Sequence, residues 1–181
     1  GDLTVLATRA AVRASVVRAC DDLDTVTLAV LEALVVADAD AAPVPLPQLR
    51  HLLGPDVPAC AVTEALSRLR ERALAWGDDD ALMVVPAVRD AVPRFPGGLA
   101  RAAGGPAGSS ALPGLLADVD EDERRVLQAL AAGPPIGRSR GDPAGPVGRL
   151  LARALLLRVD AETVELPRQV GLALRGERPL G

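Results

Sequence analysis

The sequence contains no tyrosine, no lysine, one phenylalanine, one tryptophan and one histidine among its 181 residues. Two aromatic side chains cannot line a groove for single-stranded nucleic acid, because such grooves depend on stacking of successive bases. Without lysine there is no GxxxxGK[ST] loop to hold a nucleotide phosphate. The single histidine, His51, cannot build a multi-histidine metal site, and we expect it at the surface or at its boundary. We therefore assign no catalytic residue, no metal ligand and no cofactor.

Long apolar runs and clustered cysteines are also missing. No stretch reaches the roughly 18 apolar residues of a membrane-spanning helix, and no signal peptide opens the chain. Cys20 and Cys60 form no CxxC pair, which predicts two buried thiols in a reducing compartment. We expect a soluble cytoplasmic protein, free or associated with the nucleoid, without membrane or small-molecule partners. Because the chain starts at Gly1 without methionine, we interpret it as a fragment of a longer protein.

The abundant residues are aliphatic and acidic. Hydrophobic residues make up 49% of the chain, almost all of them alanine, leucine and valine, so the core must be packed from aliphatic side chains. The net charge of -4 gives no general attraction to nucleic acid or to an anionic membrane. The charge is uneven, however. Residues 21–96 carry 13 acidic residues against 6 arginines, whereas residues 119–181 carry 9 against 10.

The first half of the chain has the order of elements of a winged helix. Asp24 is a predicted N-cap for a helix whose inner face is Val26, Val30, Leu31 and Leu34. A short strand at 44–46, a short helix ending at Gly54 and a helix over 58–74 follow; in the last, Val62, Leu66, Leu69 and Ala73 face inward. Two strands then flank Asp78, Asp79 and Asp80, Trp76 fills the core at the base of this hairpin, and residues 87–92 form a closing helix.

A second, shortened copy of this pattern follows a segment rich in glycine and proline. Arg72, Ala73 and Leu74 recur as Arg153, Ala154 and Leu155, and Pro86 recurs as Pro167, at a constant spacing of 81 residues. Leu31 and Leu34 of the first helix correspond to Leu127 and Leu130. The second copy lacks the short second helix, which GPPIGRSRGDPAGP replaces.

The predicted fold class is therefore mainly α with small β-hairpins: tandem winged-helix domains, of which the second is degenerate. We expect an N-terminal helical extension over 1–23, a first winged-helix domain over 24–96, a linker over 97–114 and a shortened second domain over 115–181.

Four phrases of the sequence suggest a family: LDTVTLAVLEAL, ALAWGDDDALMVVPAVRDAV, LLADVDEDERRVLQALAAGPPIGR and VELPRQVGLALRGERPLG. The chain resembles the helicase-associated proteins of high-GC bacteria, which contain a region similar to the N-terminal part of XPB-type helicases. The resemblance implies that this segment is the N-terminal winged-helix portion of such a protein. It does not imply ATP hydrolysis, because no helicase motor motif is present.

Two surfaces are candidates for binding. On the third helix and hairpin of the first domain, acidic and basic groups are mixed, which suits a protein surface better than a DNA groove. We expect partner contacts from Arg68, Arg70, Glu71, Asp78, Asp79 and Asp80. In the second domain, clustered arginines are candidates for contacts with nucleic-acid phosphates, although Asp160, Glu162 and Glu165 are close. These arginines are Arg138, Arg140, Arg149, Arg153 and Arg158.

The sequence leaves two functions open. The first is a non-enzymatic interaction module that serves a DNA-repair or DNA-processing assembly through protein contacts. Its partner would be a helicase, a repair factor or the rest of its own chain. The alternative is direct DNA binding through the arginines of the second domain. An enzyme is disfavoured because no nucleophile with a base, metal cluster or nucleotide cradle can be named.

Overall fold

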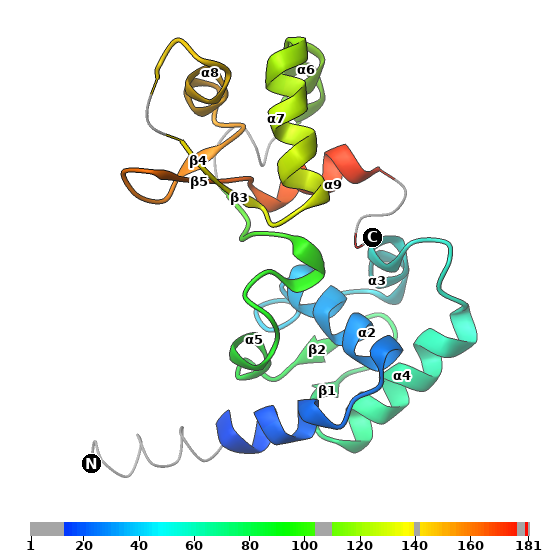
Figure 1. The fold of residues 1–181 in the computed structure, drawn as a ribbon. Coiled ribbons are helices and arrows are strands. Elements are labelled where there is room, and N and C mark those ends of the chain that lie inside the picture. Colours follow the sequence, from blue (N-terminus) through cyan, green and yellow to red (C-terminus); the bar gives the residue numbers. More distant parts are fainter. Residues whose placement is uncertain (1–12, 104–109, 140–141, 177–179, 181) are drawn as a thin grey trace. The chain divides into compact units, whose positions relative to one another are not determined.

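The computed structural model describes residues 13–103, 110–139, 142–176 and 180, which belong to two compact units, Gly1–Gly97 and Gly98–Gly181 (Figure 1). The described chain is mainly helical and contains two small antiparallel sheets. The prediction of a mainly helical chain with small hairpins is thus confirmed. Within the described ranges, every helix is too short or too polar to cross a membrane.

The first unit is built around one buried helix. After a helical stretch over 13–21, its elements are α2 (Thr25–Val36), α3 (Leu46–Leu53), α4 (Ala59–Glu71), β1 (Ala75–Trp76), β2 (Met83–Val84), α5 (Val88–Ala91) and the 3-10 turn η1 (Pro96–Gly98, which extends one residue into the second unit). Helix α2 packs against α3 and α4, and it also contacts β2. Helix, helix, helix and hairpin therefore follow one another as the sequence predicts.

Helix α2 begins at the predicted cap. The Asp24 side chain accepts hydrogen bonds from the Thr27 backbone N–H at 2.9 Å and from the Thr27 hydroxyl at 2.8 Å. Val30, Leu31 and Leu34 are completely buried, as expected, but Val26 is 41% exposed. Val26 lies in the first turn, where Thr27 takes the inward position because its hydroxyl is satisfied by the cap.

Helices α3 and α4 follow their sequence signals, with one exception. Helix α3 ends at Gly54, whose φ of 78° is in the left-handed region. In α4, Val62, Leu66 and Leu69 are buried as predicted. Ala73 is instead exposed, with a φ of 55°, because the helix ends at Glu71 and Ala73 occupies the left-handed position that reverses the chain toward β1.

The hairpin of the first unit joins a minimal sheet. Strand β1 pairs with β2 in antiparallel register, Ala75 opposite Val84 and Trp76 opposite Met83, and Val44 forms a bridge to Leu82 on the other side of β2. Trp76 is 45% exposed, so the prediction that it fills the core is wrong. Successive residues of a strand point to opposite faces, and in this two-residue strand Ala75 takes the buried face.

The second unit repeats this order in shorter form. Its elements are α6 (Leu112–Ala117), α7 (Glu121–Ala132), β3 (Ile136–Arg138), α8 (Pro146–Ala152), β4 (Leu157–Arg158), β5 (Thr163–Glu165) and α9 (Arg168–Arg175). The strands form one antiparallel sheet in the order β3-β5-β4. Strand β3 lies in the segment GPPIGRSRGDPAGP, which stands in place of the short second helix. Its place beside β5 matches that of Val44 beside β2 in the first unit.

The predicted linker is structured at both ends. Leu99 and Ala100 are buried in the second unit, and the side chain of Gln169 bonds both the N–H and the carbonyl of Ala103 at 3.1 Å. At the other end α6 begins at Leu112, whose side chain is buried. The linker prediction over 97–114 is therefore wrong for residues 99–103 and 112–114, because composition shows turn content but not burial. Residues 104–109 lie outside the described ranges.

The two units share a backbone feature that composition would not suggest. Ala73 and Ala154, which correspond in the repeat, both have a positive φ, 55° and 56°, after helices α4 and α8. The pairing of the two hairpins differs, however. Leu157 pairs with Glu165, whereas the corresponding Trp76 pairs with Met83, the counterpart of Val164. The same spacing along the sequence therefore yields hairpins that differ by one residue in register.

Helix α8 has one face covered by its own preceding loop. A Cβ on Gly148 would lie 2.4 Å from the carbonyl oxygens of Asp142 and Pro143. We predict that Gly148→Ala lowers the free energy of unfolding of the second unit by about 1–3 kcal/mol, since it overpacks a rigid contact. Gly114→Ala is the matched control, because nothing lies within 4 Å of its added Cβ. Urea unfolding followed by circular dichroism measures both; equal midpoints would contradict the prediction.

Candidate interaction surfaces

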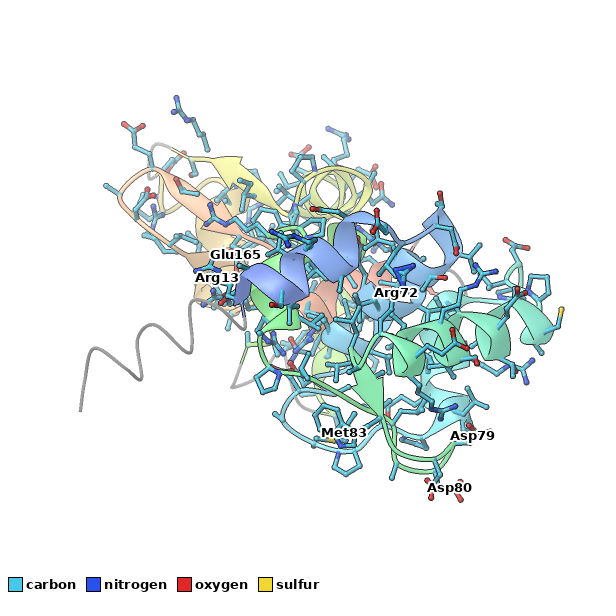
Figure 2. The ribbon with its side chains drawn as sticks, turned by 90° about the horizontal axis from the view of Figure 1, so that it is seen from below. Arg13, Arg72, Asp79, Asp80, Met83 and Glu165 are labelled. Carbon is cyan, nitrogen blue, oxygen red and sulfur yellow. The ribbon has the colours of Figure 1, made fainter. Side chains whose placement is uncertain are left out.

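The acidic hairpin tip of the first unit is held in place by three contacts. The Asp78 carboxylate accepts from the Asp80 backbone N–H at 3.1 Å, which closes the turn. The Asp79 carbonyl accepts from the Leu46 N–H at 2.7 Å, and the Asp79 carboxylate lies 3.4 Å from the Arg70 guanidinium. Figure 2 shows Asp79 and Asp80 at the outer end of the hairpin. The tip is thus acidic and anchored.

The Arg70 guanidinium makes a second contact with this hairpin. Its Nη2 also donates to the Gly77 carbonyl at 2.9 Å, and its Nε is buried without a hydrogen-bond partner. Glu71 is exposed and accepts from Ser67 at 3.4 Å. Among the predicted partner residues, Arg70, Asp78 and Asp79 are therefore used in building the hairpin, whereas Asp80 and Glu71 face solvent.

Arg68, predicted to contact a partner, lies elsewhere. Its guanidinium binds the carboxylate of Asp24, the N-cap of α2, and lies 2.6 Å from Glu64 one turn earlier on α4. Helix α4, the third helix of the winged-helix order, is thereby tied to the start of α2, the first helix of that order. In the second unit the corresponding helices are α8 and α7. We call this contact between a third-helix arginine and the first-helix N-cap the cap clamp.

The second unit has the same clamp in a more elaborate form. Asp120 caps α7 by accepting from the Glu123 N–H at 2.8 Å, and Glu123 accepts in return from the Asp120 N–H at 2.9 Å. Arg149 on α8 binds Asp120 at 2.6 Å and Glu123 at 3.0 Å. Arg153 adds a contact with Glu123 at 3.3 Å and one with the Asp118 carbonyl at 3.0 Å. The hydrogen bond of Arg149 with Glu123 raises the pKa of Arg149, and that with Asp120 raises it further by a smaller amount.

Position by position, the two clamps correspond. Arg149 follows Arg68 at the spacing of the repeat, and Asp120 stands to Leu127 as Asp24 stands to Leu31. Thr27 and Glu123 both occupy the third position after the cap, and both are completely buried. The repeat aligns Arg68 with Arg149 and, through the leading helices, Asp24 with Asp120, but the sequence did not predict that they pair. Both arginines were predicted to face outward, because helical periodicity does not show which carboxylate a long side chain will reach.

Two further candidate arginines lie on the sheet of the second unit. Arg138 on β3 and Arg158 on β4 are exposed and flank β5, pairing with Thr163 and Val164 respectively. Arg158 donates to the Ala161 carbonyl at 3.1 Å. Arg140 lies outside the described residues. Of the five predicted phosphate contacts, the structure thus brings Arg149 and Arg153 to internal carboxylates and leaves Arg138 and Arg158 at the surface.

Other reactive side chains are dispersed. His51 is exposed on α3, as predicted. Both cysteines are free, but Cys60 is exposed and Cys20 half-buried, so the prediction of two buried thiols is wrong. Cys60 lies in the first turn of α4, before the helix reaches the core. Across the part of the chain that the structure describes, no group of three or more His, Cys, Asp or Glu side chains could hold a metal ion.

Comparison of the chain with protein-family models, with curated proteins and with solved structures found no match.

Burial of Glu123 should make the second clamp the more important one for stability. We predict that Arg149→Met lowers the urea midpoint of the second unit clearly more than Arg68→Met lowers that of the first. The first substitution removes a partner from a carboxylate whose side chain is 1% exposed, whereas Asp24 can be hydrated because it is 44% exposed. Trp76 fluorescence follows the first unit, and circular dichroism follows both. A larger loss in the first unit would contradict the prediction.

Acid should weaken the first clamp. The Thr27 N–H, then its hydroxyl, and Arg68 lower the pKa of Asp24 from 3.8 to about 2. The carboxylate therefore stabilises the fold above about pH 4, and this contribution is lost as the pH falls toward 2. Asp24→Asn still caps the helix but does not titrate. We predict that its urea midpoint changes less between these pH values than that of the wild type. Asp80→Asn should follow the wild type; identical profiles for all three would contradict the prediction.

Proposed function

We propose that the chain is a non-enzymatic tandem winged-helix module that acts through protein contacts. In each unit a helix is followed by a residue or strand that pairs with the hairpin (Val44 or β3), then by the helix before the hairpin, and then by the hairpin itself. Val44 and β3 both pair beside the last strand of their hairpin. This order supports a winged-helix assignment for both units. The second unit lacks the second of three helices. We further propose, from the resemblance of its sequence, that the module belongs to a helicase-associated protein and serves a DNA-repair or DNA-processing assembly.

The observation that carries this proposal is that the arginines of the third helices are already paired with carboxylates of their own unit. A helix-turn-helix protein that reads DNA places its recognition helix in the major groove, where arginines meet phosphates and base edges. Here Arg68 and Arg149 are each bound to carboxylates of their own unit, and Arg153 is bound to Glu123. A phosphate would have to displace those carboxylates, so groove binding by these helices is disfavoured.

Two further features support protein contacts. The third helix of the second unit, α8, is seven residues long, and the loop at 142–143 covers its Gly148 face. In the first unit, the exposed hairpin tip would bring Asp78 and Asp80 toward a phosphate backbone, where like charges repel. The third helix of the second unit and the hairpin of the first unit are thus unsuited to DNA.

One observation favours the alternative of direct DNA binding. Arg138 and Arg158 are exposed on either side of β5. The pKa of Asp160, lowered mainly by a hydrogen bond from the Glu162 N–H, is lowered further by the charge of Arg138, so Arg138 already has one carboxylate nearby. Two guanidinium groups at one sheet could contact neighbouring phosphates, although Asp160 and Glu162 lie in the connecting turn. This surface is the one from which DNA contact should be tested.

The test is a pair of measurements on the 181-residue chain. We predict that fluorescence anisotropy with duplex and forked DNA at low ionic strength shows no salt-dependent binding. Affinity purification from cell extract should recover a defined protein, such as a helicase or repair factor. Recovery should fall when Asp78, Asp79 and Asp80 are replaced by Ser, because serine keeps turn chemistry without charge.

The two functions give opposite results. DNA binding that falls steeply with added salt and is lost in the Arg138→Ala, Arg158→Ala double variant would establish the alternative. The matched control is Arg125→Ala, since Arg125 lies on α7 and pairs with Glu121 and Asp122 of its own helix. Recovery of no protein by either the wild type or the Ser variant would contradict the proposed function.

A further inference from the structure

An exposed tryptophan lies beside the acidic tip of the first unit. Trp76 is the only tryptophan of the chain and is 45% exposed at the end of β1. The five residues from Trp76 to Asp80 are all exposed, so one large apolar side chain and three carboxylates are accessible within one short stretch of the hairpin. The cross-strand partner of Trp76, Met83, lies half-buried on the same face of the hairpin. The hairpin therefore exposes an apolar side chain near its base and carboxylates toward its tip.

The same hairpin is fixed in its conformation. Arg70 holds the Gly77 carbonyl and the Asp79 carboxylate, Leu46 holds the Asp79 carbonyl, and the Asp78 side chain closes the turn. Gly77 has a φ of 92°, and a Cβ there would lie 2.0 Å from the Ala81 carbonyl oxygen, so the turn requires glycine. A rigid tip loses little conformational entropy on binding, which favours recognition.

We infer that Trp76 is the anchor of a docking surface for a cationic, amphipathic protein segment. Tryptophan is enriched at the energetic centres of protein interfaces, where it fills an apolar pocket of the partner. Residues 70–80 carry four carboxylates and two guanidinium groups, so the surface around the anchor is acidic. A partner with complementary charge is therefore a segment that presents apolar and basic side chains together.

The carboxylates decide between classes of partner. A base could stack on Trp76, but its phosphates would meet Asp78 and Asp80. An anionic membrane surface would be repelled in the same way. This inference deepens the proposed function by naming the surface and the chemistry of its partner, and it rests on that function.

The test uses Trp76 as its own probe. A synthetic amphipathic helix of leucine and arginine is titrated into the 181-residue chain, and tryptophan emission is recorded. We predict a shift to shorter wavelength with this peptide and none with a matched peptide that has glutamate in place of arginine. An unchanged spectrum at saturating Leu/Arg peptide, or equal shifts with both peptides, would overturn the inference.

Variants measured with fluorescently labelled Leu/Arg peptide locate the contact. Trp76→Ala should weaken binding about tenfold or more, as expected for an anchor, and Asp80→Asn should weaken it less and reduce its salt dependence. Val159→Ala is the matched control, since Val159 is 50% exposed in the other hairpin. Loss of affinity in Val159→Ala equal to that in Trp76→Ala would refute the assignment.

A final comparison separates this inference from the proposed function. If affinity purification recovers the same protein with the wild type and with Trp76→Ala, the docking surface is refuted while the function stands. If neither recovers a protein, the function itself fails. A shift in Trp76 emission with chain concentration alone would show that a second copy occupies the surface, and would likewise overturn the inference.

Discussion

The ion pair between the first-helix cap and the third helix is the polar constraint that recurs in both units. An N-cap carboxylate satisfies a free backbone N–H and also faces the positive end of the helix dipole. By adding an arginine from the third helix, each unit fixes the start of one helix against the side of another, Asp24 with Arg68 and Asp120 with Arg149. The hairpin follows directly from the third helix through Ala73 or Ala154, so the clamp also fixes where the hairpin begins.

This constraint determines what the surface can offer. An arginine held by a carboxylate contributes little net charge to a partner, and in the second unit Glu123 occupies Arg149 and Arg153 together. The charge available for recognition therefore shifts from the third helices to the hairpins, acidic at Asp78 and Asp80 in the first unit and mixed at Arg158 and Asp160 in the second. Two related units consequently carry different surfaces, although they share the elements that hold them together.

The sequence predicted local structure better than side-chain partners. Helices with strong caps and apolar periodicity, such as the one after Asp24, were placed correctly, as was the hairpin around the three aspartates. Strand β3 was missed because a three-residue strand is defined by its neighbour β5, not by its own composition. Trp76 was misplaced because strand alternation says that one of two adjacent residues is buried but not which one. The clamp was missed because its residues are 44 and 29 positions apart and meet only after packing.

The segment 98–103 has a consequence for how the chain can be divided. Leu99 lies against Gly171, where an added Cβ would come within 3.0 Å of the leucine side chain, and Gln169 bonds the backbone of Ala103 from the same helix. Arg175 likewise donates to the Gly98 carbonyl at 3.0 Å. A fragment that started at residue 115 would expose the surface of α9 that Leu99 covers and leave the Gln169 amide to water. Residues 98–103 therefore belong to the second unit and cover one side of α9, and any autonomous form of this unit begins at Gly98.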